Sequence, residues 1–147
     1  MIYSKEFNAL LNSVEDYETI GLGNPESEIL FVGKESGIEV VYNEDLIGIK
    51  NKFKKCHGSA FHWKSRKIDY TNNPIKLVEL SDTWQNYQYL FESIYEKEKR
   101  SDSATFLKKV FTTEMSNFPA KTTGKAKKIP YFNEELIKRK GTFFKSE

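Results

Sequence analysis

Apolar side chains near the start of the chain recur at the spacing of an α-helix. Over residues 4–19 they fall three or four positions apart, at Phe7, Leu10, Leu11, Val14 and Tyr17. Such a stripe is typical of a helix that packs one face on a core. Ser4 is suited to cap the first turn and Gly21 to end the helix. We therefore predict a helix over residues 4–19.

The clearest helical pattern lies in the middle of the chain. It begins at Ser81 and Asp82, either of which can cap the first turn. The apolar stripe then recurs at Trp84, Tyr87, Leu90 or Phe91, and Ile94. Residues 96–100 form a polar exit whose cations suit the negative end of the helix dipole. The aromatic stripe is predicted to pack in the core, the alternative being a platform that stacks on bases.

A last short helix is predicted from Glu134 to Lys140. Asn133 precedes it as a cap, acids occupy its first turn, and cations occupy its last. Gly141 is expected to end the helix. The apolar pair Phe143-Phe144 could then enter another strand.

Two short apolar segments predict strands. The segment Ile29-Leu-Phe-Val32 lies between glycine-rich turns and lacks polar alternation, so we expect it to be buried on both faces. A second strand is predicted around residues 109–115, before Asn117 and Pro119. The order strand, loop, helix, strand indicates a crossover unit with parallel strands. The predicted fold class is therefore α/β, with a small, mostly parallel sheet.

Two regions between these elements carry weaker patterns. Residues 38–49 fit either a strand, through Val40, Val41 and Tyr42, or the start of a helix. Residues 51–73 are predicted to be irregular, ending in the turn signal Asn72-Asn73-Pro74. A loop of this length inside a compact domain is usually functional or mobile.

Composition limits the class of protein. With 147 residues, the chain is expected to form a single α/β domain over residues 1–147 with a real core. No apolar run is long enough to span a membrane, and no secretory signal is recognisable. Cys56 is the single cysteine, which excludes an internal disulfide and fits a reducing compartment. We therefore expect a cytoplasmic protein without a membrane partner.

The charge is unevenly distributed along the chain, although the net charge is only +2. Residues 1–49 hold ten acids against two lysines. Residues 50–67 and 115–132 contain no acid, and the second of these stretches carries Lys121, Lys125, Lys127 and Lys128. Such asymmetry indicates a polyanionic partner, the alternative being solvated lysines on loops.

The loop Gly33-Lys34-Glu35-Ser36-Gly37 is the first candidate for chemistry, because it follows the first predicted strand. Ligands of open parallel sheets bind outside the carboxyl ends of the strands. Glu35 could orient water or stabilise a developing cation, and Lys34 could hold an anion. Glu114, after the second strand, is expected at the same edge. The alternatives are an ordinary strand-to-helix turn for the loop, and a helix cap or salt bridge for Glu114.

The histidines and the cysteine offer little for a metal. Cys56, His57 and His62 are local in the sequence and too few for a typical zinc site. A thiol nucleophile at Cys56 is equally weakly supported, since adjacent residues rarely aim at each other. No metal and no cofactor is predicted.

These residues also resemble a known family. Asn24-Pro25 before an Ile-Leu-Phe-Val-Gly strand, followed by a short loop ending in glycine, resembles the first motif of the uracil-DNA glycosylase superfamily. The pieces 83–87 and 111–115 also resemble uncharacterised, divergent bacterial members of it. The resemblance implies a three-layer α/β/α sandwich around a parallel four-stranded sheet. Gly33 and Gly37 match the loop ends, and Glu35 falls where active members place their water-positioning Asp or Asn.

The chain departs from that family in two places. Ser36 stands where the family loop has proline. The family's second motif, a late His- or Asn-containing loop, has no counterpart in this chain. Phe143-Phe144 resembles the start of the family's next strand, so the resemblance implies a truncated member, with the sandwich incomplete at the C-terminus.

The resemblance implies hydrolysis of the N-glycosidic bond of a base in DNA, or binding of nucleic acid. Glu35 is the catalytic candidate. The substrate-binding candidates are Gly33, Lys34, Ser36, Gly37 and Glu114. The candidates for phosphate and base contacts are Lys52, Lys54, Lys55, Trp63, Lys64, Arg66 and Lys67. The alternative is a non-enzymatic interaction module built on the same scaffold.

Overall fold

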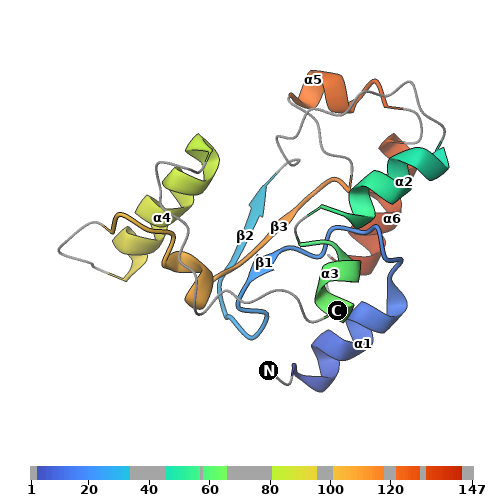
Figure 1. Cartoon of the computed structure of the whole chain (residues 1–147). Coiled ribbons are helices and arrows are strands. Elements are labelled where there is room, and N and C mark those ends of the chain that lie inside the picture. The colour runs from blue at the N-terminus through green and yellow to red at the C-terminus, as the bar shows by residue number, and fades with distance from the viewer. Residues whose placement is uncertain are drawn as a thin grey trace.

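A computed structural model of the chain describes residues 3–33, 46–56, 58–65, 81–95, 101–117, 122–129 and 132–143 (Figure 1). Within these ranges the protein is mixed α/β, with six α-helices and a small three-stranded sheet. The helices are α1 (Lys5–Ser13), α2 (Leu46–Lys54), α3 (Ala60–Lys64), α4 (Asp82–Ile94), α5 (Thr123–Ala126) and α6 (Phe132–Phe143), with a 3-10 helix η2 (Phe106–Lys108). The strands are β1 (Leu22–Gly23), β2 (Leu30–Gly33) and β3 (Phe111–Glu114). No helix in these ranges has the length and apolar character that crossing a bilayer requires.

The sheet has the order β1-β3-β2, so β3 lies in the centre. β2 and β3 are parallel, with Leu30 opposite Phe111 and Gly33 opposite Glu114. The predicted strand pair and its parallel direction are therefore confirmed. β1 pairs antiparallel with β3 and was not predicted, because the glycines around it indicate a turn.

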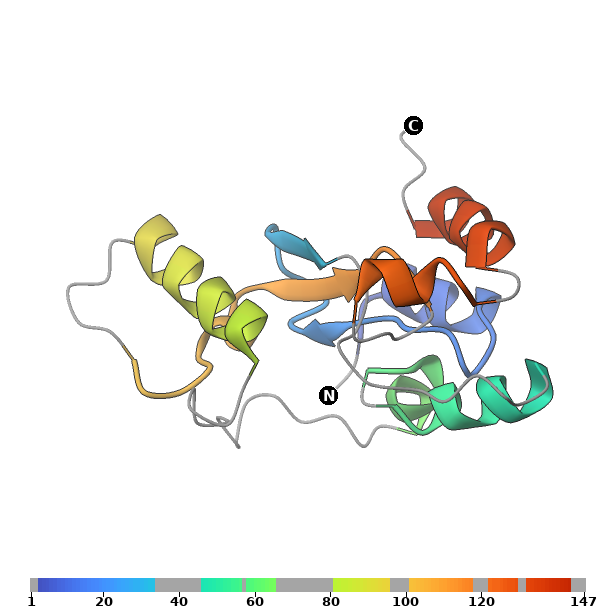
Figure 2. The same cartoon turned by 90° about the horizontal axis from the view of Figure 1, so that it is seen from above.

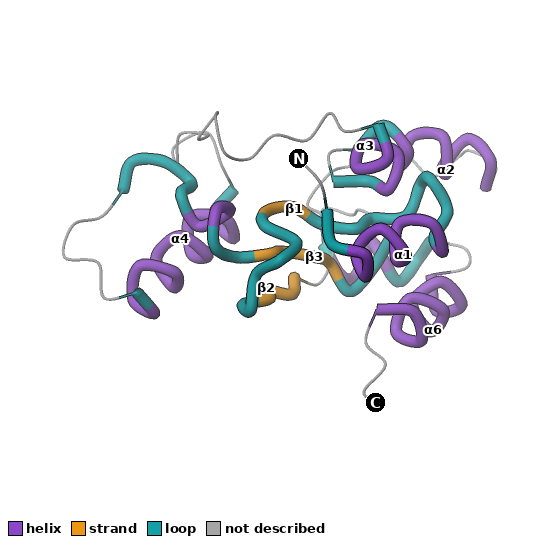
Figure 3. Tube along the Cα trace, turned by 90° about the horizontal axis from the view of Figure 1, so that it is seen from below, coloured by secondary structure: helices purple, strands orange, loops and turns teal. Residues whose placement is uncertain are grey.

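Helices pack against both faces of the sheet, because successive side chains of a strand point to opposite faces. On one face Phe31 contacts the ring of Tyr87 from α4, with centroids 5.1 Å apart. On the other face Phe111 contacts Phe7 of α1 and Trp63 of α3. α4 accordingly lies on one side of the strands, and α1 and α3 lie on the other (Figure 3).

The buried apolar residues form three clusters. The α4 cluster consists of Phe31, Phe91, Ala104, Phe106, Leu107 and Val110. The α1 cluster consists of Phe7, Leu11, Val14, Ile20, Ala60 and Trp63. The α2–α5 cluster consists of Tyr17, Ile49, Phe53, Ala126, Ile129 and Phe132. The last of these lies beyond the carboxyl end of β3 and joins helices that are far apart in the sequence (Figure 1).

The first predicted strand is buried on one face only. Phe31 is 8% exposed, whereas Leu30 and Val32 are 48% and 41% exposed. The prediction of burial on both faces is therefore wrong. β2 is the outer strand of the sheet formed by the described residues, and its second face is left open there.

The first helix is shorter than the apolar stripe indicated. Ser4 caps it as predicted, accepting a hydrogen bond from the N–H of Phe7 at 3.1 Å. The helix ends at Ser13, because Val14 is extended, with φ −114° and ψ 154°. Tyr17 is buried all the same, but in the α2–α5 cluster. The stripe thus predicted burial correctly beyond the point at which the helix ends.

Residues 46–65 are more helical than predicted. α2 and α3 occupy much of this stretch, so the irregular loop predicted over residues 51–73 is wrong for residues 51–54 and 60–64. Phe53 and Trp63 are each 1% exposed and anchor these two short helices in the core. Their isolated aromatic residues, set among lysines, show no periodic signal in the sequence.

The later helices agree with prediction in part. α4 begins at Asp82 with Ser81 at its N-cap, as expected. Its stripe is partly exposed, since Phe91 is buried but Leu90 and Ile94 are 48% and 46% exposed.

α6 differs from the predicted last helix at both ends. It starts at Phe132, so Asn133 lies inside it instead of capping it. It continues through Gly141 to Phe143, which is therefore helical and does not enter a strand.

Candidate functional site at the carboxyl edge of the sheet

Gly33 and Glu114 meet at the carboxyl ends of the parallel strands β2 and β3. They are opposite each other in the strand register. A Cβ atom at position 33 would overlap the Oε2 atom of Glu114, so the carboxylate lies directly against the glycine backbone. Both residues were predicted as site residues, and the structure brings them together. A side chain at position 33 would therefore require the Glu114 carboxylate to move.

The Glu114 carboxylate is also close to the phenol of Tyr87 on α4. The pKa of Tyr87 is raised above its ordinary value, first by burial and second by the negative charge of Glu114. The phenol therefore remains a hydrogen-bond donor at neutral pH. This part of the edge combines a carboxylate with a protonated phenol.

Arg139 fixes the backbone at the end of β3 from the opposite face. Its side chain, 0% exposed, donates from Nε to the carbonyl oxygen of Glu114 at 2.7 Å. It also donates from Nη2 to Thr113 Oγ1 at 2.7 Å and from Nη1 to Asn117 Oδ1 at 3.0 Å. Burial lowers the pKa of Arg139 to about 10, against the opposing charges of Glu18 and Glu114. Arg139 therefore positions the backbone of Glu114.

The sequence predicts Arg139 as a cation in the last turn of a helix, and it does not predict that this side chain is buried. A signal was present, because Phe132, Leu136 and Arg139 follow one another at i, i+4 and i+7 on one face of α6. An arginine on the apolar face of a short helix indicates a buried polar partner.

A second buried carboxylate, that of Glu18, connects the segment before β1 to α6. Glu18 is 2% exposed and accepts hydrogen bonds from the N–H of Glu15 at 3.1 Å and from Lys138 Nζ at 3.4 Å. Burial acts to lower the pKa of Lys138, but the charge of Glu18 and weaker neighbouring groups raise it overall. The residues before β1 are thereby joined to α6.

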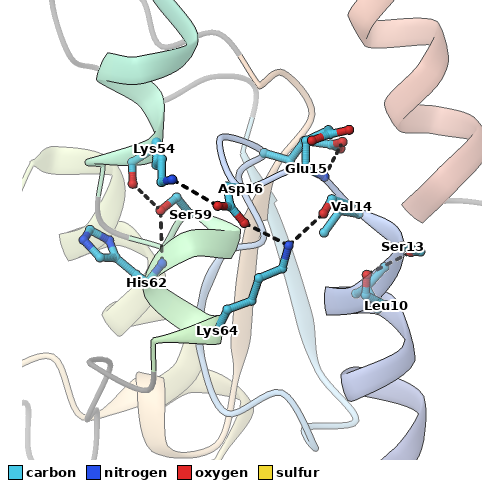
Figure 4. A network of polar contacts seen from close by, with 10 residues as sticks. Leu10, Ser13, Val14, Glu15, Asp16, Lys54, Ser59, His62 and Lys64 are labelled. Atoms are coloured by element: carbon cyan, nitrogen blue, oxygen red, sulfur yellow. Dashed lines mark hydrogen bonds and ion pairs between the residues drawn. The ribbon is translucent and has the colours of Figure 1, made fainter.

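Asp16 holds two of the lysines predicted to bind phosphate. It forms ion pairs with Lys54 at 3.1 Å and with Lys64 at 3.0 Å, as Figure 4 shows. The hydrogen bonds from Lys64 and then from Lys54 lower the pKa of Asp16. Lys54 also lies over the ring of Phe61, 4.6 Å from its centroid. These two lysines therefore have a structural role. Two further candidates, Lys52 and Lys55, have exposed side chains on and just after α2.

Trp63 is a core residue, and its predicted role as a base-stacking side chain is wrong. It is 1% exposed, and its Nε1 donates a hydrogen bond to the carbonyl oxygen of Gly21 at 2.9 Å. Its ring meets Phe7 edge to face, with centroids 5.0 Å apart. An aromatic ring in this position offers no face to a nucleotide.

Several predicted site residues lie outside the described ranges: Lys34, Glu35, Ser36, Gly37, Arg66 and Lys67. In the sequence, Glu35 follows Gly33 by two positions, and Gly33 lies at the edge formed with Glu114. His57 also lies outside these ranges, and among the residues inside them no three His, Cys, Asp or Glu side chains form a group suited to a metal. Burial raises the pKa of the Cys56 thiol, which makes it a poorer nucleophile.

This edge thus sets a carboxylate against the backbone of a glycine and within electrostatic reach of a phenol. Comparisons of the chain with known protein families, with curated proteins and with solved structures found no match. Its function must therefore be argued from these residues and their geometry.

Proposed function

We propose that this chain binds DNA and hydrolyses the N-glycosidic bond of a base at the carboxyl edge of β2 and β3. The observation that carries the proposal is the parallel pairing that sets Gly33 beside Glu114. Ligands of parallel sheets bind at this edge. In the sequence, the segment 33–37 that resembles the uracil-DNA glycosylase motif, with Glu35 in it, starts at Gly33.

The proposed reaction needs a carboxylate and a base-binding group. A nucleotide is flipped out of the stack at a cost of a few kcal/mol. As the bond between the sugar and the base breaks, the base leaves with the electron pair and positive charge develops on the sugar. Glu35 stabilises this charge and takes a proton from the water whose oxygen bonds to the sugar carbon. Glu114, held by Arg139 through its backbone, accepts a hydrogen bond from an N–H group of the base.

The proposal includes a three-layer α/β/α arrangement of the domain in the cytoplasm. The packing of α4 on Phe31 and of α1 on Phe111, on opposite faces of the sheet, supports the layers. The single cysteine, Cys56, is compatible with a reducing compartment.

The test is release of the base from labelled duplex oligonucleotides that contain uracil or mismatched bases. We expect the wild-type chain to release a base from at least one of them. Glu35→Gln should lower the rate by about 10²-fold or more, because the amide cannot take the proton. The matched control is Glu28→Gln, at an exposed carboxylate before β2, which should leave the rate unchanged. Equal rates for wild type and Glu35→Gln would exclude Glu35 as the catalytic residue.

A second candidate is a module that binds nucleic acid without chemistry. It is favoured by the exposed side chains of Lys52 and Lys55, which are available to a polyanion whether or not a catalytic site exists. This candidate predicts DNA binding without base release from any of the oligonucleotides. It also predicts that Glu35→Gln binds DNA as tightly as the wild type does.

A further inference from the structure

The two acid-free, lysine-containing stretches of the sequence come together in the fold. Ile49 and Phe53 of α2 pack in one cluster with Ala126 of α5 and with Ile129 just after it. α5 lies near the carboxyl end of β3, and seen from above α6 and α2 lie toward different sides of it (Figure 2). Segments about 70 positions apart in the sequence thus pack against each other.

The segments that make this apolar contact also carry lysines. Five of them have exposed side chains: Lys52, Lys55, Lys125, Lys127 and Lys128. In the adjoining segment 14–20, Asp16 pairs with two lysines and Glu18 pairs with Lys138, whereas the side chain of Glu15 is exposed. Glu134 and Glu135 in the first turn of α6 are the acids that follow α5. The surface therefore keeps an excess of positive charge.

We propose that α2 and α5 together form one phosphate-binding surface for the backbone of a nucleic acid. The identity of the ligand rests on the proposed function, whereas the joining of the two helices into one site does not. Two adjacent helices with their side chains span about 20 Å. Over that length a DNA duplex carries about 12 phosphate charges. The surface can therefore contact several phosphates at once, next to the edge where a base would be received.

A nucleic acid fits this surface better than an anionic membrane does. A helix that binds a bilayer presents its apolar face outward. α2 instead turns Ile49 and Phe53 into the core, where they are 3% and 1% exposed, and leaves Ile47 outside at 69%. The exposed part of the surface is thus mainly cationic, as phosphate contacts along a backbone require.

The test compares two lysine pairs with a control pair in the full chain. Lys52→Gln/Lys55→Gln alters α2, Lys127→Gln/Lys128→Gln alters the end of α5, and a quadruple variant alters both. The control, Lys108→Gln/Lys109→Gln, removes the same charge from exposed positions at η2, near α4. Binding of a fluorescent 20-base-pair duplex is measured by anisotropy at several salt concentrations. Circular dichroism verifies that each variant is folded.

We expect each test pair to weaken binding about tenfold and to reduce the slope of log K against log salt by about 1.8, since each lost phosphate contact contributes about 0.9. The quadruple variant should show about the product of the two losses, because one ligand contacts both helices. The control pair should bind as the wild type does.

Three outcomes would overturn the inference. If the α5 pair binds like the control while the α2 pair is weakened, the two helices do not form one site, although the proposed function stands. If all four variants bind as tightly as the wild type, neither helix contacts DNA. If the wild type binds vesicles containing phosphatidylserine but not the duplex, the surface recognises a membrane. Base release is measured separately, and it decides whether the chain hydrolyses the N-glycosidic bond.

Discussion

Arg139 is the residue that most determines the geometry of the candidate edge. A buried guanidinium costs desolvation energy, and its lowered pKa of about 10 reflects that cost. The cost is offset by hydrogen bonds to three different oxygens, two on β3 and one on Asn117. Because one planar group makes all of them, the end of β3 is held in a single position relative to α6.

Replacing Arg139 should destabilise the fold strongly. Arg139→Met removes the donor from three buried oxygens, and we expect it to lower the free energy of unfolding by about 3 kcal/mol. Arg139→Lys should lower the free energy of unfolding by about half as much, since one ammonium group cannot reach all three acceptors. The neighbouring exposed position provides the control, and Lys140→Met should change stability by less than about 0.5 kcal/mol. Urea unfolding followed by circular dichroism measures these values. Similar losses at positions 139 and 140 would contradict the structural role of Arg139.

Asp16 makes the stability of the fold depend on pH. Because Lys64 and Lys54 lower its pKa, the folded state binds its proton less readily than the unfolded state does. The ion pairs therefore contribute fully above pH 3.8, the ordinary aspartate value, and their contribution is lost as the pH falls through the lower folded value. We expect Asp16→Asn to have a lower melting temperature than the wild type at pH 7 and to approach it at about pH 2.

A series of thermal melts between pH 2 and pH 7 tests this expectation. Asp102→Asn, at an exposed aspartate outside these ion pairs, removes the same charge and serves as the control. If the difference in melting temperature between the wild type and Asp16→Asn is the same at every pH, the ion pairs are not its cause.

At the scale of elements, the sequence predicted the helices and strands that have a strong local pattern. The helix from Asp82, the strands β2 and β3 and their parallel pairing were all predicted, because each has a strong periodic or apolar signal. β1 was not, since two residues with glycine at one end become a strand only through pairing with β3. The predicted and observed site residues differ for the same reason. Gly33 and Glu114 follow from strand ends, whereas the burial of Arg139 and Trp63 depends on tertiary packing.

Two glycines on different elements should respond to alanine with opposite signs. Gly21 has φ +129°, and a Cβ there would overlap the carbonyl oxygen of Thr112. Gly21→Ala should therefore destabilise the protein by more than about 2 kcal/mol or prevent folding. Gly141 lies inside α6, and a Cβ atom added to it would meet no other atom within 4 Å. Gly141→Ala should stabilise the protein by up to about 1 kcal/mol, because alanine favours a helix.

Chemical denaturation of both variants measures the change in the free energy of unfolding and its sign. Destabilisation by Gly141→Ala would indicate that the glycine ends the helix, as its sequence position first suggested, and would contradict the observed course of α6 to Phe143.

At the scale of the whole molecule, β3 joins the apolar clusters. Val110, just before the strand, belongs to the α4 cluster, and Phe111 packs against the α1 cluster. Thr113 connects the same strand to α6 through Arg139. Within the described residues, β3 and the residue before it therefore contact the apolar clusters on both sides of the sheet. A molecule built in this way should unfold as one unit, because loss of β3 removes support from both sides.

The two tryptophans allow this cooperativity to be measured, since they lie on opposite sides of the sheet. Trp63 belongs to the α1 cluster, and Trp84 packs against the α4 cluster, with its ring 5.7 Å from that of Phe106. Trp84→Phe leaves Trp63 as the reporter, and Trp63→Phe leaves Trp84. Trp63→Phe should also lower stability by about 1 kcal/mol, because the carbonyl oxygen of Gly21 loses its donor. In each variant we expect the midpoint of unfolding from tryptophan fluorescence to coincide with the midpoint from far-ultraviolet circular dichroism. If α4 unfolds separately, Trp84 will report a lower midpoint than circular dichroism does, and the view of β3 as a shared support for both sides will have to be abandoned.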